Sequence, residues 1–142
     1  MKKILSLICL SLALHTATFA KSKDVQAINT MLAAQVVEWN KGNVEGYMHG
    51  YWESDSLLFI GSKGPRYGYG ATLKRYKEAY PDKDHMGTLT STITRMDKLS
   101  DEYYFVVGKW ELKRTVGDLN GSYTLLIRKI KGNWVIVCDH SS

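Results

Sequence analysis

The chain has 142 residues, of which 44% are hydrophobic and 23% are charged, and its formal net charge is +5. This length suits one domain with one hydrophobic core. The lysines and arginines are scattered in short clusters, a pattern that solvated surfaces explain better than a nucleic-acid-binding face, so we expect no nucleic-acid partner.

The first twenty residues have the pattern of a secretory signal peptide. A pair of lysines precedes an apolar stretch over residues 4–14, and Thr18 and Ala20 are small residues at the positions that a signal peptidase inspects. The apolar stretch is too short to span a membrane. We therefore expect a signal peptide over residues 1–20, a mature domain over residues 21–142, and a periplasmic or secreted protein that does not associate with a membrane once the signal is removed.

Helical periodicity marks three segments in the first half of the mature chain. Apolar residues recur at three- and four-residue steps over residues 24–40, as an amphipathic helix requires. A short second helix follows, with Tyr47 and Tyr51 on one face. A third helix is expected over residues 71–80, and the proline that comes next stops it.

Strand patterns surround the third helix and dominate the second half. A short apolar strand (57–60) and a glycine-rich hairpin (61–70) precede that helix. Longer strands are expected over residues 87–99, 102–115, 122–130 and 133–140, with Asn-Gly in a hairpin loop over residues 118–121. Helices followed by antiparallel strands predict an α+β domain, with three helices packed on one face of a curved sheet.

This order of elements resembles the nuclear transport factor 2-like superfamily of cone-shaped domains, and in particular its small secreted members related to the SnoaL-like polyketide cyclases. The resemblance covers nearly all of the mature chain, and the closing strand is its most specific part. It implies a bent sheet around an apolar cavity that is open at one end, and a homodimer formed through the outer sheet face. The segments that carry it are Trp39-Asn40-Lys41-Gly42-Asn43, Pro65-Arg66-Tyr67-Gly68, Gly108-Lys109-Trp110, Trp134-Val135-Ile136 and Asp139-His140-Ser141-Ser142.

Two departures from related patterns limit what the resemblance implies about function. Ketosteroid-isomerase-like members carry a catalytic aspartate in the first strand, and residues 57–60 contain no acid. The hub domains of calcium/calmodulin-dependent kinases end in a similar strand with histidines; His140 matches one of them, but Cys138 stands where another would be. Neither function is carried over to this chain.

The polar end of the last strand supplies the candidate catalytic residues, Asp139 and His140. Successive side chains of a strand point to opposite faces, so His140 is expected on the face of Trp134 and Ile136, with Asp139 on the other. Both can line one pocket only if the strand has ended or bulges there. A histidine at the cavity mouth would titrate near neutrality and could act as an acid or a base. A triad with the adjacent serines fails on geometry.

A structural alternative stands beside this catalytic interpretation. One of the two residues would close the cavity or anchor the chain, while the other faces solvent or a dimer partner. Cys138 is left alone once the signal peptide is removed, which excludes an intramolecular disulfide. The histidines lack the spacing of metal ligands, so we expect no metal and no cofactor.

Aromatic residues on the core-facing stripes are the second sign of a site. A cavity lined by tyrosine and tryptophan suits a small apolar or aromatic molecule, and Arg114 could reach a carboxylate on it. The candidate ligand-binding residues are Trp39, Tyr47, Tyr51, Trp52, Tyr69, Tyr76, Trp110 and Arg114.

Three functions remain open from the sequence. The first is an exported small-molecule-binding domain without established catalysis. The second is a cofactor-independent lyase, isomerase or cyclase that uses His140 as its general acid or base. The third is a dimeric structural or interaction module whose cavity is filled by its own side chains.

Overall fold

Ten helices and strands make up the part of the chain that the structure, a computed structural model, describes: residues 22–142. The predicted signal peptide lies outside these residues. The elements are α1 (Lys23–Asn40), α2 (Val44–Met48), β1 (Leu58–Gly61), β2 (Gly64–Tyr67), α3 (Tyr69–Ala79), α4 (Lys83–Met86), β3 (Thr88–Lys98), β4 (Tyr103–Lys113), β5 (Leu119–Ile130) and β6 (Asn133–Ser141).

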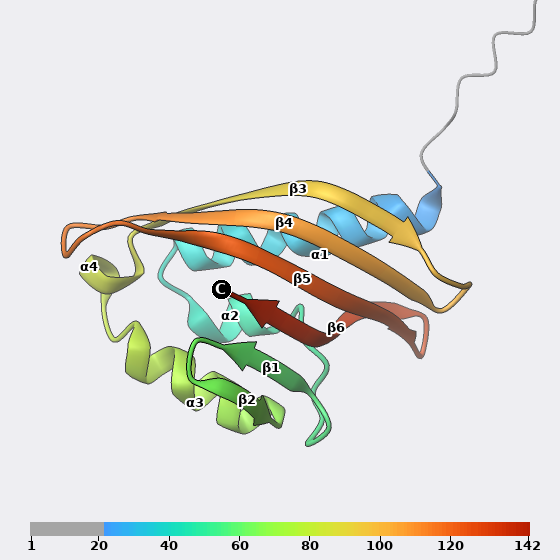
Figure 1. Cartoon of the computed structure of the whole chain (residues 1–142), viewed down its shortest axis with the longest axis horizontal. Coiled ribbons are helices and arrows are strands. Elements are labelled where there is room, and N and C mark those ends of the chain that lie inside the picture. Colours follow the sequence, from blue (N-terminus) through green and yellow to red (C-terminus); the bar gives the residue numbers. More distant parts are fainter. Residues whose placement is uncertain (1–21) are drawn as a thin grey trace, which may run out of the picture.

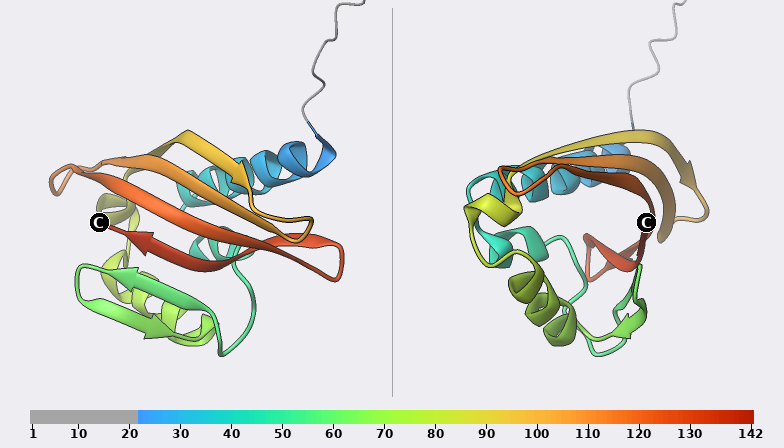
Figure 2. Two further views of the ribbon diagram at one scale, coloured as in Figure 1. Left: turned by 45° about the vertical axis from the view of Figure 1, so that its right-hand side comes forward. Right: turned by 60° about the vertical axis from the view of Figure 1, so that its left-hand side comes forward.

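The six strands form one curved sheet in the order β2-β1-β6-β5-β4-β3. All neighbours are antiparallel except β1 and β6, which run parallel. The long strands β3 to β6 curl over α1 (Figure 1). Seen from another side, the sheet, α1 to α3 and the β1–β2 hairpin are arranged in a ring (Figure 2, right). This is the α+β cone expected from the sequence.

The helix α1 is fixed at both of its ends. Ser22 caps it by accepting a hydrogen bond from the Val25 amide at 3.2 Å. In its first turn, Asp24 accepts hydrogen bonds from Lys129 of β5 at 3.0 Å and from the Trp134 indole of β6 at 3.2 Å. At the other end the Trp39 indole donates to the Met86 carbonyl at 3.1 Å. One face of α1 is therefore held against the sheet.

No helix within residues 22–142 is long and apolar enough to cross a membrane.

Apolar side chains from the helices and the inner sheet face form the core. The side chains that are buried most completely include Ile28, Met48, Leu57, Val106, Ile127 and Ile136. They come from α1, from α2 and the segment after it, and from β4, β5 and β6, so the core joins the helical layer to the central strands. Burying each of these side chains contributes about 1.5–3 kcal/mol to folding.

Gly108 in β4 allows one strand to lie unusually close to a neighbouring side chain. It pairs with Tyr123 of β5, and a Cβ atom at position 108 would lie 2.2 Å from the Tyr123 ring and 2.7 Å from the Thr92 carbonyl oxygen. The ring therefore crosses the backbone of Gly108, and its hydroxyl lies 3.0 Å from the Ser91 hydroxyl of β3. A glycine here is a packing requirement of the inner sheet face.

One sequence expectation about local structure was wrong, and one short helix was not expected. The loop between β4 and β5 spans residues 114–118, where the Asp118 side chain accepts a hydrogen bond from the Arg114 amide at 2.9 Å. Asn120 and Gly121 are paired residues of β5, opposite Glu111 and Trp110, so their turn-like sequence did not form the turn. The short helix α4 was not expected; its start is capped by Asp82, which accepts from the His85 amide at 2.9 Å.

Candidate functional site

A cavity of about 420 Å³ lies between the helices and the inner face of the sheet. It takes side chains from α1, α2, α3 and all six strands, and its aliphatic wall is formed by Leu32, Val36, Leu89, Leu112, Leu125 and Ile136. Among the candidate ligand-binding residues, the structure brings Trp39, Tyr47, Tyr51, Tyr76 and Trp110 together around it. A largely apolar pocket with a few polar groups is the usual form of a small-molecule site.

A bulge in β6 decides which polar residue enters this cavity. Leu126 of β5 pairs with Cys138, but the next residue, Ile127, pairs with Ile136, so Val137 is an extra residue on β6. The bulge reverses the alternation of side chains beyond it. Asp139 therefore shares the inner face with Ile136 and is only 3% exposed, although strict alternation from Ile136 would place it outside.

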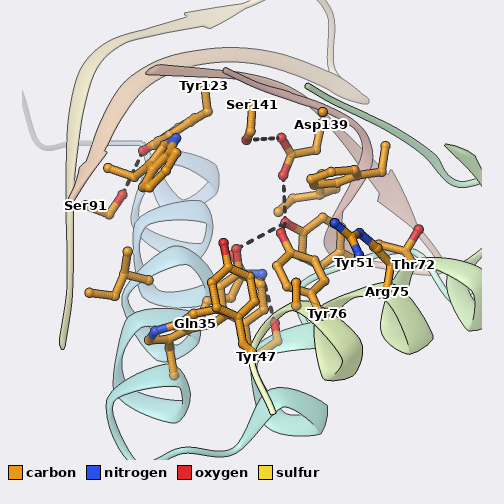
Figure 3. Close-up of a pocket in the computed structure, with 18 of the residues that line it drawn as sticks. Gln35, Tyr47, Tyr51, Thr72, Arg75, Tyr76, Ser91, Tyr123, Asp139 and Ser141 are labelled. Carbon is orange, nitrogen blue, oxygen red and sulfur yellow. Dashed lines mark hydrogen bonds between the residues drawn. The ribbon is translucent and has the colours of Figure 1, made fainter. Parts of the chain in front are cut away.

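The Asp139 carboxylate has a hydrogen-bond donor on each oxygen. The Tyr51 hydroxyl donates to Oδ2 at 2.7 Å, and the Ser141 hydroxyl donates to Oδ1 at 2.7 Å (Figure 3). Tyr51 follows α2 and Ser141 ends β6, so the carboxylate is held by two separate parts of the chain. Such bonds orient the group without giving it a cationic partner.

Burial sets the protonation of Asp139. Removal from water raises the pKa of this carboxyl from 3.8 to about 6, against the lowering effect of the Tyr51 and Ser141 hydrogen bonds and of His140 nearby. The group is therefore a base at pH 7 and an acid below about pH 6. A titratable carboxyl of this kind in a cavity is a functional-site candidate on physical grounds.

Three tyrosines, which we call the tyrosine cluster (Tyr47, Tyr51 and Tyr76), extend the polar group from Asp139. The Tyr51 oxygen lies 3.3 Å from the Tyr47 hydroxyl and 3.5 Å from the Tyr76 hydroxyl. Because Tyr51 gives its own proton to Asp139, the other two hydroxyls donate toward Tyr51, and at these lengths the bonds are weak. The Tyr47 and Tyr76 hydroxyls can therefore donate to a ligand oxygen instead, with little loss of hydrogen-bond energy.

The tyrosine hydroxyls stay protonated at physiological pH. Burial, followed by the charge of Asp139, raises the pKa of Tyr47 to about 12 and that of Tyr51 well above its usual range. The pKa of Tyr76 is also raised strongly, by burial first and then by its neighbours in the cluster. The site therefore combines one carboxyl that titrates and several hydroxyls that remain donors.

Gln35 and Trp110 add polar atoms elsewhere on the wall. Gln35 is 6% exposed, and its amide nitrogen donates to the Tyr47 carbonyl at 2.9 Å, which leaves the amide oxygen without a hydrogen bond among the described residues. The Trp110 indole nitrogen is buried and likewise has no acceptor within residues 22–142. In the sequence, Gln35 is a polar residue on the apolar face of the helix over residues 24–40. A polar residue on such a face is the sign by which it could have been predicted as a site residue.

The expected position of His140 was wrong. The residue is exposed and does not line the cavity, because the bulge at Val137 turns it to the outer face of β6. Asp139, which alternation had placed on that outer face, takes the inner position. The two residues therefore do not act on one pocket, and of the two only Asp139 can touch a molecule inside it.

Three candidate ligand-binding residues also lie away from the cavity. Trp52 and Tyr69 are half-buried and do not line it, and Tyr69 packs against the core beside it. Arg114 is tied to the end of the β4–β5 hairpin, where it donates to the carbonyls of Gly117 at 2.6 Å and His85 at 3.3 Å. The sequence pattern predicted these residues on core-facing stripes, but none of the three lines the cavity in the structure.

Within residues 22–142 no group of three or more His, Cys, Asp or Glu side chains is arranged to hold a metal ion. Cys138 is half-buried, and burial followed by the charge of Asp139 raises the pKa of its thiol, which disfavours the reactive thiolate.

Comparison with solved structures shows the family. A protein of unknown function with an NTF2-like fold, from Shewanella oneidensis MR-1, is 41% identical, with 84% of this chain and 98% of that chain covered and a TM-score of 0.80. The chain therefore belongs to the nuclear transport factor 2-like family. No protein-family model matches the sequence, and no curated protein matches it either.

More distant structures share the fold alone. A ketosteroid isomerase-like protein from Erwinia carotovora atroseptica SCRI1043 is 17% identical, with 85% of this chain and 98% of that chain covered and a TM-score of 0.63. A type 2 hexachlorocyclohexane dehydrochlorinase is 16% identical, with 84% of each chain covered and a TM-score of 0.68. Family membership does not fix a function, because functions in such folds depend on the residues of the site.

Proposed function

We propose that this chain is an exported small-molecule-binding domain. Its ligand would be small and largely apolar or aromatic, and would present a hydrogen-bonding group to Asp139 and the tyrosine cluster. The observation that carries this proposal is a buried carboxyl, with its pKa raised to about 6, at the wall of a largely apolar cavity of about 420 Å³. Burying such a group lowers stability, and a ligand that bonds to it repays that loss on binding.

Export and self-association belong to the same proposal. Export is supported by the signal-peptide pattern over residues 1–20, and N-terminal sequencing of the mature protein would check the cleavage after Ala20. The outer face of the central strands carries half-buried apolar side chains, among them Phe105, Val107, Leu126 and Val135. A homodimer through this face stays a prediction, and the mass of the protein in solution checks it.

Filling the cavity with a larger side chain is expected to abolish binding. Ala79 lies on α3 and lines the cavity, so a phenylalanine at this position would occupy the space of a ligand. A panel of aromatic fragments, neutral and acidic, is screened by ligand-observed NMR against wild type and Ala79→Phe. We expect binding to wild type and a loss of at least tenfold in affinity for the variant, a factor of ten being about 1.4 kcal/mol.

The matched control is Ala71→Phe on the same helix. Ala71 is exposed and does not line the cavity, so this variant carries the same added ring outside it. It should bind fragments as wild type does. If no fragment binds wild type, or if Ala79→Phe binds as tightly as Ala71→Phe, the binding proposal fails and the interaction-module alternative takes its place.

A second candidate function is acid–base catalysis without a cofactor, with Asp139 as the group that moves the proton. The raised pKa of Asp139, about 6, favours this candidate, because a base titrating near neutrality is both available and strong enough to accept a proton. Proteins of this fold include, by their names, a dehydrochlorinase and a ketosteroid isomerase-like protein. That analogy concerns the fold and adds no residue to the argument.

A general-base probe tests this candidate. In 5-nitrobenzisoxazole, a base removes the single C–H proton of the isoxazole ring while the N–O bond breaks, and the cyanophenolate product is measured by its absorbance. Wild type should accelerate this opening above the buffer rate. The rate should rise with pH through about 6, because only the ionised Asp139 carboxylate accepts the proton.

Two variants decide which residue acts in this reaction. The rate with Asp139→Asn should be at least tenfold lower than with wild type and close to the buffer rate, because general-base catalysis typically contributes about 10²–10⁴-fold. His140→Ala should keep the wild-type rate, because His140 is exposed on the outer face. Catalysis that survives in Asp139→Asn, or that is lost in His140→Ala, would count against Asp139 as the base.

A further inference from the structure

Two arginines line the cavity. Arg66 comes from β2 and Arg75 comes from α3, and both side chains are half-buried. Lys63, at the exposed tip of the β1–β2 hairpin, adds a third cation to the lining. Among the residues that line the cavity, Asp139 is the one with a carboxylate side chain. The wall of this largely apolar space therefore carries more positively than negatively charged side chains.

The elements aim both arginines inward. On α3 the cavity-facing residues recur at helical spacing as Thr72, Arg75, Tyr76 and Ala79, so Arg75 occupies a position that would normally bury an apolar side chain. Figure 3 shows the Arg75 side chain extending from α3 beside Tyr51 and Tyr76. Arg66 pairs directly with Phe59 of β1, whose side chain also lines the cavity, so these two share the inner face of the sheet.

Neither arginine has a hydrogen-bonding or ion-pairing partner in the described part of the chain, although the charge of Arg75 opposes the burial that raises the pKa of the Tyr80 hydroxyl. No hydrogen bond or ion pair joins Arg66 or Arg75 to any residue of 22–142. The other arginines all have one: Arg95 pairs with Asp97, Arg114 donates to two carbonyls, and Arg128 lies 5.4 Å from the centre of the Tyr103 ring. Two unpaired guanidinium groups in one pocket wall are therefore a feature of the cavity and not of the surface as a whole.

Asp139 does not neutralise these arginines. Arg66, Phe59 and Asp139 form one row across β2, β1 and β6, which separates the Cα atoms of Arg66 and Asp139 by two strand spacings, roughly 10 Å. The charge that most affects Asp139 is that of His140, and neither arginine contributes to the shift of its pKa. The cavity wall thus carries two arginines in addition to the Asp139 carboxyl and the tyrosine hydroxyls, with Arg66 two strands away from Asp139 and Arg75 beside the tyrosine cluster.

We propose that Arg66 and Arg75 form an anion-binding subsite, and that the ligand is a small organic acid whose carboxylate binds there while its apolar body lies against Phe59 and Tyr76. Guanidinium groups bind carboxylates through paired, charge-assisted hydrogen bonds. The Phe59 and Tyr76 rings pack edge to face with their centres 5.6 Å apart. Phe59 pairs with Arg66 across β1 and β2, and Tyr76 follows Arg75 on α3. This inference rests on the proposed function and specifies its ligand class.

The test compares an acid with its neutral analogue. 2-Naphthoate and 2-naphthamide have the same ring system and nearly the same shape, but only the first carries a negative charge at pH 7.5. Their affinities for wild type and for the double variant Arg66→Gln/Arg75→Gln are measured by isothermal titration calorimetry. We expect wild type to bind naphthoate roughly tenfold or more tightly than naphthamide, as charged hydrogen bonds in a partly dry site would give.

The double variant should lose this preference and keep its affinity for naphthamide, because the aromatic walls are unchanged. Arg95→Gln makes the same chemical change at one arginine outside the cavity, with the loss of one charge instead of two, and should behave as wild type. Naphthamide binding by the double variant also shows that it is folded.

Each other outcome overturns a defined part of the inference. Equal affinities for acid and amide in wild type, or a preference that survives in the double variant, would overturn the anion subsite and leave the binding proposal standing. Failure of both probes and of the fragment panel to bind wild type would overturn the binding proposal itself. Tighter binding of 2-naphthyl phosphate than of naphthoate would overturn the assignment to a carboxylate.

Discussion

Replacing Asp139 by asparagine is expected to stabilise the protein by about 2–3 kcal/mol at pH 8 and to leave its stability nearly unchanged at pH 4. Burial raises the pKa of this carboxyl from 3.8 to about 6, and each pKa unit corresponds to about 1.4 kcal/mol. The folded protein therefore holds this proton more tightly than the unfolded chain does. This tighter proton binding stabilises the folded wild type at low pH. As pH rises from about 4 to about 6, the wild type loses this stabilisation, whereas the asparagine variant does not titrate and has no such stabilisation to lose.

Urea unfolding of both proteins between pH 4 and pH 8 measures this effect. The difference between the two free energies of unfolding is the useful quantity, because other carboxyls with lowered pKa values act in the opposite direction in both proteins. These are Asp24, Glu38, Glu45, Asp82, Asp101 and Asp118. Asp97→Asn, outside the cavity, is the control and should not stabilise the protein, because it removes the partner of Arg95. A difference that is constant across the range would contradict the buried, titrating carboxyl.

Gly108→Ala is expected to destabilise the protein by about 3 kcal/mol. The added methyl group would lie 2.2 Å from the Tyr123 ring and 2.7 Å from the Thr92 carbonyl oxygen, so the ring or the strand must move. Overfilling a packed interior typically lowers stability by about 1–3 kcal/mol, and here the neighbour on one side is backbone that cannot rotate away. The Tyr123–Ser91 hydrogen bond on the cavity wall should be lost as well.

Gly70→Ala provides the matched control. Gly70 lies in the first turn of α3, has open space around the position of a Cβ atom, and has an ordinary helical backbone. Alanine there should stabilise the protein by about 0.5–1 kcal/mol, because it restricts the unfolded chain and favours the helix. Thermal unfolding of the two variants should shift in opposite directions. A Gly108→Ala variant as stable as wild type would mean that the inner sheet face yields more readily than its geometry indicates.

The sequence predicted the fold well because each long element has a clear periodicity. The helix over residues 24–40 corresponds to α1, and the four later strands correspond to β3 to β6 with shifts of a few residues. The failures were local. Asn120-Gly121 suggested a turn, but pairing with β4 continued through it. The actual loop comes earlier in the chain, where the Asp118 carboxylate accepts hydrogen bonds from the Lys113 side chain and the Arg114 amide.

The site was predicted only in part, and the reason lies in β6. Residues 134–138 are all apolar or cysteine, so the pattern offers no alternation from which a bulge at Val137 could be seen. Counting from Trp134 therefore exchanged the positions of Asp139 and His140. Arg75 was missed for a related reason: in the sequence it belongs to a short basic cluster, and only the packing of α3 shows that it faces the cavity.

The place of β6 between β5 and β1 has a consequence for how the molecule assembles. β1 and β6 pair in parallel although about eighty residues separate them, as in Phe59 with Asp139. Contacts so far apart along the chain close late and slow folding, because the intervening segment loses its freedom before they form. We therefore expect the cavity to appear in the last step of folding, when β6 docks and carries Asp139 inward.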